Sequence, residues 1–228
     1  MRKIACSFPA LLLFFLSFCL FEACDNGYKG TFPSVVLEFA TLQADDEGNP
    51  AFLITDAGQR HSILRDRTNT TLEPKEIKRV LCYYELSESE DGVIIYTLAK
   101  PITSVPIPED ELEEIKNGPI IVQSSWMGGG YLNLIVQIRL KDPSKHKIAF
   151  IEEEVSCVDG VKKVFLSLYH DEGDDFFSHT ERSYFSIPLH QYLYAGDEST
   201  LVEIFFSYFD YSGKRQTISE SLEKEKRE

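Results

Sequence analysis

The sequence predicts an all-β protein built from two successive β bodies, a small barrel followed by an antiparallel sandwich. Short runs rich in Val, Ile, Phe and Tyr alternate with polar residues and are separated by turns containing Gly, Asp and Pro. Of the 228 residues 43% are hydrophobic, with 16 Phe and 11 Tyr, which is enough for packed cores and excludes a disordered or collagenous chain. One short stretch near the middle, 109–118, has the composition of a helix and divides the runs into two groups.

A secretion signal precedes these bodies. Arg2 and Lys3 are followed by an apolar run from Ala5 to Phe21 and then by polar residues, which is typical of a signal peptide occupying residues 1–23. The apolar run is 17 residues long, at the short limit for a membrane span, and no basic cluster follows it. We therefore expect the segment to be removed rather than retained as a transmembrane helix.

The end of the signal contains a candidate lipidation site, Cys24. Ala23 followed by Cys24 resembles the end of a bacterial lipobox, in which the cysteine thiol takes a diacylglyceryl group and becomes the new amino terminus. Phe21 and Glu22 depart from the usual residues of that motif. We predict a lipid anchor at Cys24, which would hold the protein in the bacterial cell envelope, at the outer membrane. Ordinary cleavage after Ala23, which would leave a free thiol, is the alternative.

The charge of the chain excludes one large class of partner. The chain has 37 acidic and 23 basic side chains, and removing Arg2, Lys3 and Glu22 with the signal leaves 36 against 21. Affinity for nucleic acid comes mostly from Lys and Arg that displace counterions, so a net charge of −15 opposes it. We expect no nucleic-acid partner.

The first β body is predicted over residues 32–108, after a polar tether at 24–31. Its apolar runs are short and separated by polar turns, which describes a small barrel or sandwich. The runs are 32–39, 51–55, 61–64, 80–86 and 93–98. Pro106 and Pro108 then stop regular strand pairing. The acidic residues 109–117 are predicted to form an interdomain linker with one or two helical turns at most.

The second β body is predicted over residues 118–212. From Tyr131 to Leu140 every second residue is apolar, so this run is predicted to be a strand with one face in a core. Further runs are joined mostly by hairpin-length connections, as in an antiparallel sandwich. These runs are 148–155, 163–169, 184–189 and 201–209. Residues 213–228 are rich in Lys, Arg, Glu and Ser and are predicted to be a flexible charged tail.

The order of these features resembles the NigD-like lipoproteins of Gram-negative envelopes. In that family the second domain opens with a Trp, a Gly-rich turn and a Tyr-Leu-Asn strand. The matching segment here is Trp126-Met127-Gly128-Gly129-Gly130-Tyr131-Leu132-Asn133-Leu134. The resemblance covers nearly the whole chain after the signal and implies a lipid anchor, an N-terminal OB-type barrel and a C-terminal β-sandwich. The family takes its name from a gene beside a bacteriocin, which implies an immunity role, and it supplies no catalytic or binding residue.

Three aromatic residues are candidates for a partner surface. Trp126 precedes the Gly-rich turn, where it either covers the open end of the sandwich core or faces a ligand. Phe206 and Tyr208 belong to an aromatic run in which alternate residues face opposite sides, so an outer face carrying both is predicted to bind a partner. Packing in the core is the alternative for all three residues.

No catalytic, cofactor or metal site is predicted. The Gly-x-Ser-x-Gly, P-loop, His-Glu-x-x-His and Cys-x-x-Cys patterns are absent from the sequence. The densest polar cluster, His170–Asp175, lacks the spacing of a calcium loop, and we interpret it as a solvated hairpin tip. Cys82 and Cys157 are predicted to be separate thiols, with a disulfide in an oxidising envelope as the alternative.

Three classes of function remain open on the sequence. The preferred one is a noncatalytic envelope lipoprotein whose acidic body binds a protein or glycan partner. The second is an immunity-type protein that neutralises a secreted toxin, since a cationic toxin would be steered by the negative charge. The third is a hydrolase of glycans or cell wall that uses unrecognised carboxylates.

Overall fold

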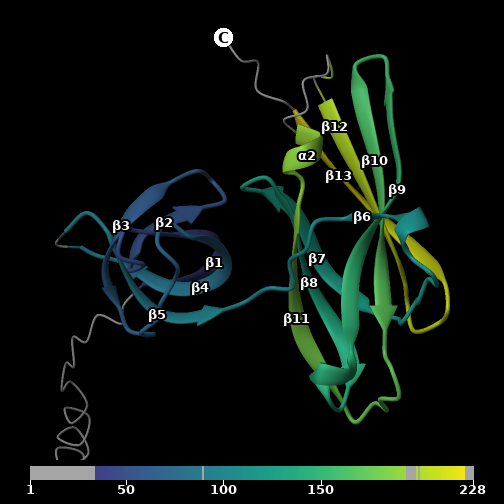
Figure 1. Ribbon diagram of the computed structural model, residues 1–228, viewed down its shortest axis with the longest axis horizontal. Coiled ribbons are helices and arrows are strands. Elements are labelled where there is room, and N and C mark those ends of the chain that lie inside the picture. Colours follow the sequence, from purple (N-terminus) through teal and green to yellow (C-terminus); the bar gives the residue numbers. More distant parts are fainter. Residues whose placement is uncertain (1–33, 89, 194–198, 200, 224–228) are drawn as a thin grey trace, which may run out of the picture. The chain divides into compact units, whose positions relative to one another are not determined.

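The computed structural model describes residues 34–88, 90–193, 199 and 201–223, and the chain from Ser34 onward forms one unit (Figure 1). The predicted signal peptide at 1–23, Cys24 and the tether at 24–31 lie outside the described residues. Almost every regular element that is described is a strand, so the predicted all-β class is confirmed. No helix among the described residues is long and apolar enough to cross a membrane.

Five strands close into a barrel. They are β1 (Val35–Ala44), β2 (Pro50–Thr55), β3 (Arg60–Asp66), β4 (Ile77–Leu86) and β5 (Val93–Ala99). The order around the barrel is β1-β2-β3-β5-β4, and β4 pairs back onto β1, as in an OB-type barrel. Only β3 and β5 run parallel to each other. Closure leaves no free sheet edge in this body.

Side chains from alternate positions along these strands fill the interior of the barrel. Leu42 of β1 and Leu53 of β2 are register partners, and both are fully buried. The core of the barrel contains small and medium-sized side chains and one tyrosine: Ala40, Leu42, Leu53, Val80, Cys82, Tyr84, Val93 and Ile95. Residues of the opposite parity therefore lie on the outer wall of the barrel.

The second body is a sandwich of two sheets. One sheet contains β7 (Ile121–Gly128), β8 (Tyr131–Leu140) and β11 (His179–Pro188), in the order β11-β8-β7. The other contains β6 (Ile107–Pro108), β9 (Lys147–Val158), β10 (Val161–Asp171), β12 (Leu201–Phe209) and β13 (Arg215–Glu223). Its order is β13-β12-β10-β9-β6, and it is antiparallel except for the pairs β10–β12 and β6–β9. A short helix, α2 (His190–Leu193), follows β11.

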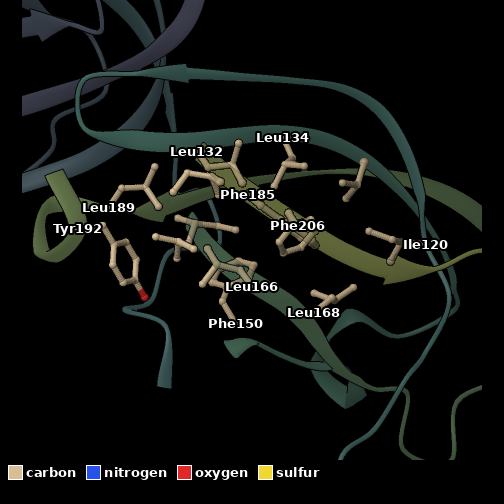
Figure 2. Close-up of a cluster of buried hydrophobic side chains, with 14 of the residues drawn as sticks. Ile120, Leu132, Leu134, Phe150, Leu166, Leu168, Phe185, Leu189, Tyr192 and Phe206 are labelled. Carbon is tan, nitrogen blue, oxygen red and sulfur yellow. The ribbon is translucent and has the colours of Figure 1, made fainter. Parts of the chain in front are cut away.

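The sandwich core lies between the two sheets (Figure 2). Leu132, Leu134, Val136, Ile138 and Leu140 are each at most 3% exposed, which confirms the predicted buried face of the 131–140 strand. Three aromatic rings also enter the core, one from the same sheet and two from the opposite sheet, and the centroid of one of them lies 5.7 and 6.3 Å from those of the other two. These rings are Phe150, at the centre, and Phe185 and Phe206. Burial of such large side chains is the main favourable term in folding.

The carboxyl-terminal segment differs from its prediction. Residues 213–228 are not a flexible tail throughout, because Arg215–Glu223 form β13 and pair with β12 in antiparallel register. Ile218 of this strand packs against the sandwich core. Charged side chains are common on exposed edge strands, so the composition of such a strand is similar to that of a disordered tail.

The linker predicted at 109–117 has little regular structure. It begins after β6 with a single 3-10 turn, η1 (Glu109–Glu111), in place of the one or two helical turns expected. At its far end Gly118 donates its backbone N–H to the carbonyl of His170 at 2.8 Å. The linker is therefore held at both ends to the five-stranded sheet, at β9 through β6 and at β10 through His170.

Candidate functional site

A buried arginine organises the polar contact between the barrel and the three-stranded sheet. Arg79 lies on the outer wall of β4, and its side chain is 3% exposed. Its Nη1 and Nη2 atoms donate to the two carboxylate oxygens of Asp56 at 2.5 and 2.7 Å. This is a bidentate pair, the geometry in which an arginine and a carboxylate interact most strongly.

Two residues of the sandwich also accept hydrogen bonds from Arg79. Nη2 also donates to Oδ1 of Asn133 at 3.0 Å, and Nε donates to the hydroxyl of Ser186 at 2.9 Å. The Asn133 amide donates in turn to Asp56 Oδ2 at 2.8 Å, and the Ser186 hydroxyl donates to Asn133 Oδ1 at 2.7 Å. Four of the five N–H groups of Arg79 thus have hydrogen-bond acceptors and its charge is paired, which reduces the penalty for burying it.

The Gly-rich turn between β7 and β8 lies directly against Asp56. Gly129 has φ +60°, and a Cβ atom there would lie 2.5 Å from Asp56 Oδ1, so only glycine fits. Its N–H donates to the carbonyl of Asp56 at 3.1 Å. The ring of Trp126 packs edge-on against Phe39 of the barrel, with centroids 5.5 Å apart. Tyr131 places its ring 4.2 Å from the Arg79 guanidinium.

These contacts define what we call the joint: Phe39, Asp56, Arg79, Trp126, Gly129, Tyr131, Asn133 and Ser186. They explain the unusual segment that opens the second body, because its Trp, Gly, Tyr and Asn residues all contact the barrel. Trp126 packs on Phe39 of the barrel, a contact that neither interpretation of this residue from the sequence includes. No sequence pattern marks Asp56 or Arg79 as part of such a contact. Asp56 directly follows β2, and Arg79 lies within β4.

The two remaining aromatic candidates have different positions. Phe206 is fully buried in the sandwich core, so the prediction that it lies on an outer face is wrong. The even-numbered residues at the start of β12 face inward, and Phe205 faces outward, where its ring stacks on that of Phe165 at 4.9 Å. Tyr208 is half-buried; it packs against the core and lines a recess on the five-stranded sheet.

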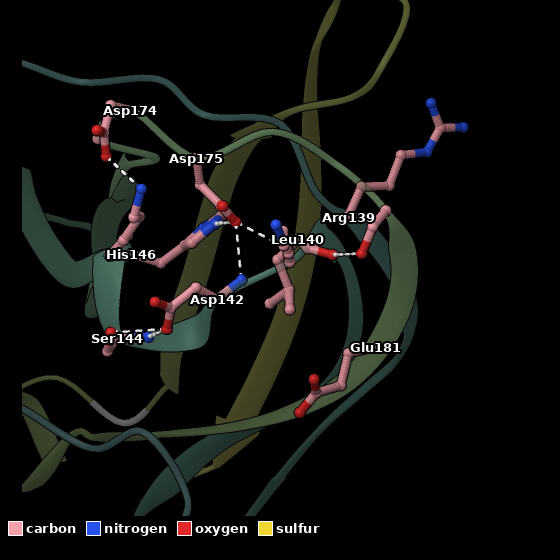
Figure 3. Close-up of polar contacts among 12 residues, drawn as sticks. Arg139, Leu140, Asp142, Ser144, His146, Asp174, Asp175 and Glu181 are labelled. Carbon is pink, nitrogen blue, oxygen red and sulfur yellow. Dashed lines mark hydrogen bonds and ion pairs between the residues drawn. The ribbon is translucent and has the colours of Figure 1, made fainter.

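A second polar cluster joins two histidines and an aspartate. His146 Nδ1 lies 2.8 Å from His170 Nε2, and His146 Nε2 lies 3.2 Å from Asp175 Oδ2. The same carboxylate oxygen accepts the backbone N–H groups of Lys141 and Asp142 at 2.8 and 3.1 Å (Figure 3). The side chains of His146 and Asp175 are 4% and 3% exposed. The prediction of a solvated tip at 170–175 is therefore wrong for His170 and Asp175.

The pKa values of Asp175 and His170 are both lowered, the first by hydrogen bonding and the second by burial. The backbone N–H of Lys141 is the main cause that holds the pKa of Asp175 well below its usual range. Burial lowers the pKa of His170 to about 4, because the cationic form is poorly solvated there. At neutral pH the cluster therefore combines a carboxylate anion with a neutral His170.

This cluster predicts acid sensitivity. Unfolded His170 gains a proton as the pH falls below about 6.5, whereas the folded residue stays neutral down to about 4. Between these values the unfolded state binds more protons, so acidification should lower the free energy of unfolding by up to about 3 kcal/mol through this residue. Urea unfolding at pH values across that window measures the loss. The variant His170→Gln should lose less over the same interval, and an equal loss in both proteins would contradict the assignment.

The described residues offer no obvious reactive centre. No group of three or more His, Cys, Asp or Glu side chains within them is placed to hold a metal ion. Cys82 and Cys157 are free thiols rather than a disulfide. Burial in the barrel raises the pKa of Cys82 to about 12, so this thiol is a poor nucleophile at neutral pH.

Comparisons with known proteins identify the second body. Residues 103–221 match the model of the NigD-like C-terminal beta sandwich domain. A search of curated proteins finds no match.

Solved structures match almost the whole described unit. A NigD-like immunity protein from Bacteroides caccae is 31% identical with a TM-score of 0.68, and the match covers 82% of this chain and 93% of the other. A protein described as toxin-related from Parabacteroides distasonis is 18% identical with a TM-score of 0.64, over 84% and 94% of the two chains. A protein provisionally named a lipoprotein from Bacteroides fragilis is 14% identical with a TM-score of 0.57, over 86% and 100%. At these lower identities the last two establish the fold alone.

Proposed function

Because this chain belongs to the NigD-like family, we propose that it is a lipid-anchored, noncatalytic binding protein of the bacterial cell envelope. One observation carries the proposal. The segment that resembles the family most closely, Trp126–Leu134, contributes its polar side chain, Asn133, to the joint. The distinctive residues of the chain therefore build a two-body scaffold rather than a reactive centre, and a scaffold of this kind serves binding.

The anchor is proposed at Cys24. The predicted leader ends at Ala23, directly before Cys24, and a structural neighbour is provisionally named a lipoprotein, which supports the same localisation. Each buried methylene contributes about 0.8 kcal/mol to membrane binding, and two acyl chains together anchor stably where one does not. An acylated Cys24 would hold the β bodies close to the membrane, because few residues separate it from Val35 at the start of β1.

Growth in radiolabelled palmitate tests the anchor. The wild-type protein should carry the label and sediment with the envelope, and Cys24→Ser should lose the label and enter the soluble fraction. Cys157→Ser is the matched control, because Cys157 is an exposed thiol in the folded body and should leave labelling unchanged. An unlabelled wild-type protein, or a labelled Cys24→Ser protein, would refute the anchor.

Neutralisation of a toxin is the second candidate function. The neighbour from Bacteroides caccae is named an immunity protein, and a net charge near −15 after cleavage would steer a cationic toxin toward this chain. The association rate with such a toxin should fall steeply as salt is added. Binding whose rate does not change with salt would remove the electrostatic basis of this candidate.

A further inference from the structure

A recess lies where the linker crosses the outer face of the five-stranded sheet. Its cavity volume is about 160 Å³ and it is partly open to solvent, so it has room for one small ligand residue rather than for a drug-sized molecule. Figure 1 shows the linker leaving β6 beside this sheet. Its wall on the linker side includes Glu109, Ile115 and Asn117. We call this space the linker recess.

The floor of the linker recess carries a row of hydroxyl groups. Ser167 of β10 is the register partner of Ser207 of β12, which in turn is the partner of Thr217 of β13. Strand alternation places all three on the same side of the sheet. The Ser207 and Thr217 hydroxyls lie 3.0 Å apart and hydrogen-bond to each other. Ser167 and Ser207 both line the recess.

Three polar groups of the recess are available to a ligand. Within the described part of the chain, the Ser167 hydroxyl, the Asn117 amide and the Glu109 carboxylate have no hydrogen-bond partner among the side chains. They provide both donors and acceptors, and they come from β10 and from the two ends of the linker. Unused hydrogen-bonding groups that converge on one space are a feature of ligand sites.

An ion pair and one aromatic ring form the rest of the wall. Both carboxylate oxygens of Glu153, on β9, accept from Nη2 of Arg215, on β13, at 2.6 Å. The pair therefore links two strands that are separated by β10 and β12. Phe209, which has the same parity in β12 as Ser207, lines the same recess and supplies apolar ring surface, whereas the ring of Tyr208 packs against the core. The wall thus combines charged hydrogen-bonding groups with one aromatic ring.

We propose that the linker recess binds a neutral saccharide residue. Sugar hydroxyls both donate and accept, so they can satisfy a carboxylate, an amide and a serine hydroxyl together, while the apolar face of the sugar packs on a ring. The linker adds acidic side chains at 109–111, 113 and 114, which oppose an anionic sugar. This inference rests on the proposed binding function and names a glycan as the partner.

Saturation-transfer NMR on the full chain, extracted in a detergent without sugar groups, tests the proposal. The probes are methyl glycosides of neutral hexoses and of N-acetylhexosamines, with methyl glucuronide as the anionic comparison. At least one neutral glycoside should give a saturable signal, and the glucuronide should bind at least tenfold more weakly. The double variant Asn117→Ala/Ser167→Ala should weaken the neutral probe at least tenfold.

Ser221→Ala is the matched control, because Ser221 of β13 pairs with Glu203 and does not line the recess. It should leave saccharide binding unchanged, and thermal unfolding should show that all variants are folded. Absence of binding by every neutral probe, equal binding of the glucuronide, or unchanged binding by the double variant would each refute the proposal. A protein that carries the palmitate label but binds no saccharide would refute the proposed saccharide site and would leave the proposed lipid anchor supported.

Discussion

Replacement of Arg79 by alanine should lower the free energy of unfolding by about 3–5 kcal/mol, the usual cost of removing one partner of a buried ion pair. The substitution leaves the Asp56 carboxylate, whose side chain is 15% exposed, without its bidentate partner. It also removes a donor from Asn133 and a donor from Ser186. Urea unfolding at neutral pH measures the change.

Arg65→Ala is the matched control for Arg79→Ala. Arg65 also lies on a barrel strand, β3, but it is exposed, so its loss should change stability by no more than about 0.5 kcal/mol. The double variant Asp56→Ala/Arg79→Ala should be more stable than the sum of the two single losses implies, because it leaves no uncompensated charge. Equal effects of Arg79→Ala and Arg65→Ala would show that the joint contributes little to stability.

Phe206→Ala is expected to be the second severe substitution, with a loss of about 3–5 kcal/mol. Phe206 is fully buried in the sandwich core, and the centroid of its ring lies 6.3 Å from that of Phe150. Deleting it leaves a cavity between the sheets that the surrounding strands cannot close. Calorimetric or urea unfolding measures the loss.

The neighbouring phenylalanine gives a matched control for this substitution. Phe205→Ala removes the same side chain from the opposite face of β12, where the ring is half-buried and stacks on Phe165. It should cost about 1 kcal/mol, the scale of one aromatic pair. A larger loss for Phe205→Ala than for Phe206→Ala would reverse the inward and outward assignment of β12.

Sequence periodicity predicts the β bodies well and their faces less well. From 131 to 140 only one parity is apolar, so the pattern alone identifies the buried side, and the structure confirms it. In β12 aromatic residues occupy both parities, because one face enters the core and the other carries the Phe165–Phe205 stack. Periodicity cannot choose between such faces, which is why Phe206 is misplaced in the sequence-based prediction.

The joint and the histidine cluster depend on contacts between residues far apart in sequence. Arg79 and Ser186 are separated by 107 positions, so neither residue signals the other. Asp175 lies in a run of acidic residues, a composition that is typical of a solvated turn. It is buried because backbone N–H groups of the β8–β9 turn bind it, and the sequence does not encode their position locally.

Acrylamide quenching of Trp126 fluorescence tests most directly the central claim, that the segment opening the second body is a joint with the barrel. The chain has 1 Trp, so its emission reports on this contact alone. Native wild-type protein should be quenched much less than its urea-unfolded form, and folded Arg79→Ala should be quenched more than folded wild type. Free quenching of Trp126 in the native protein, with no change in the Arg79→Ala variant, would contradict the claim.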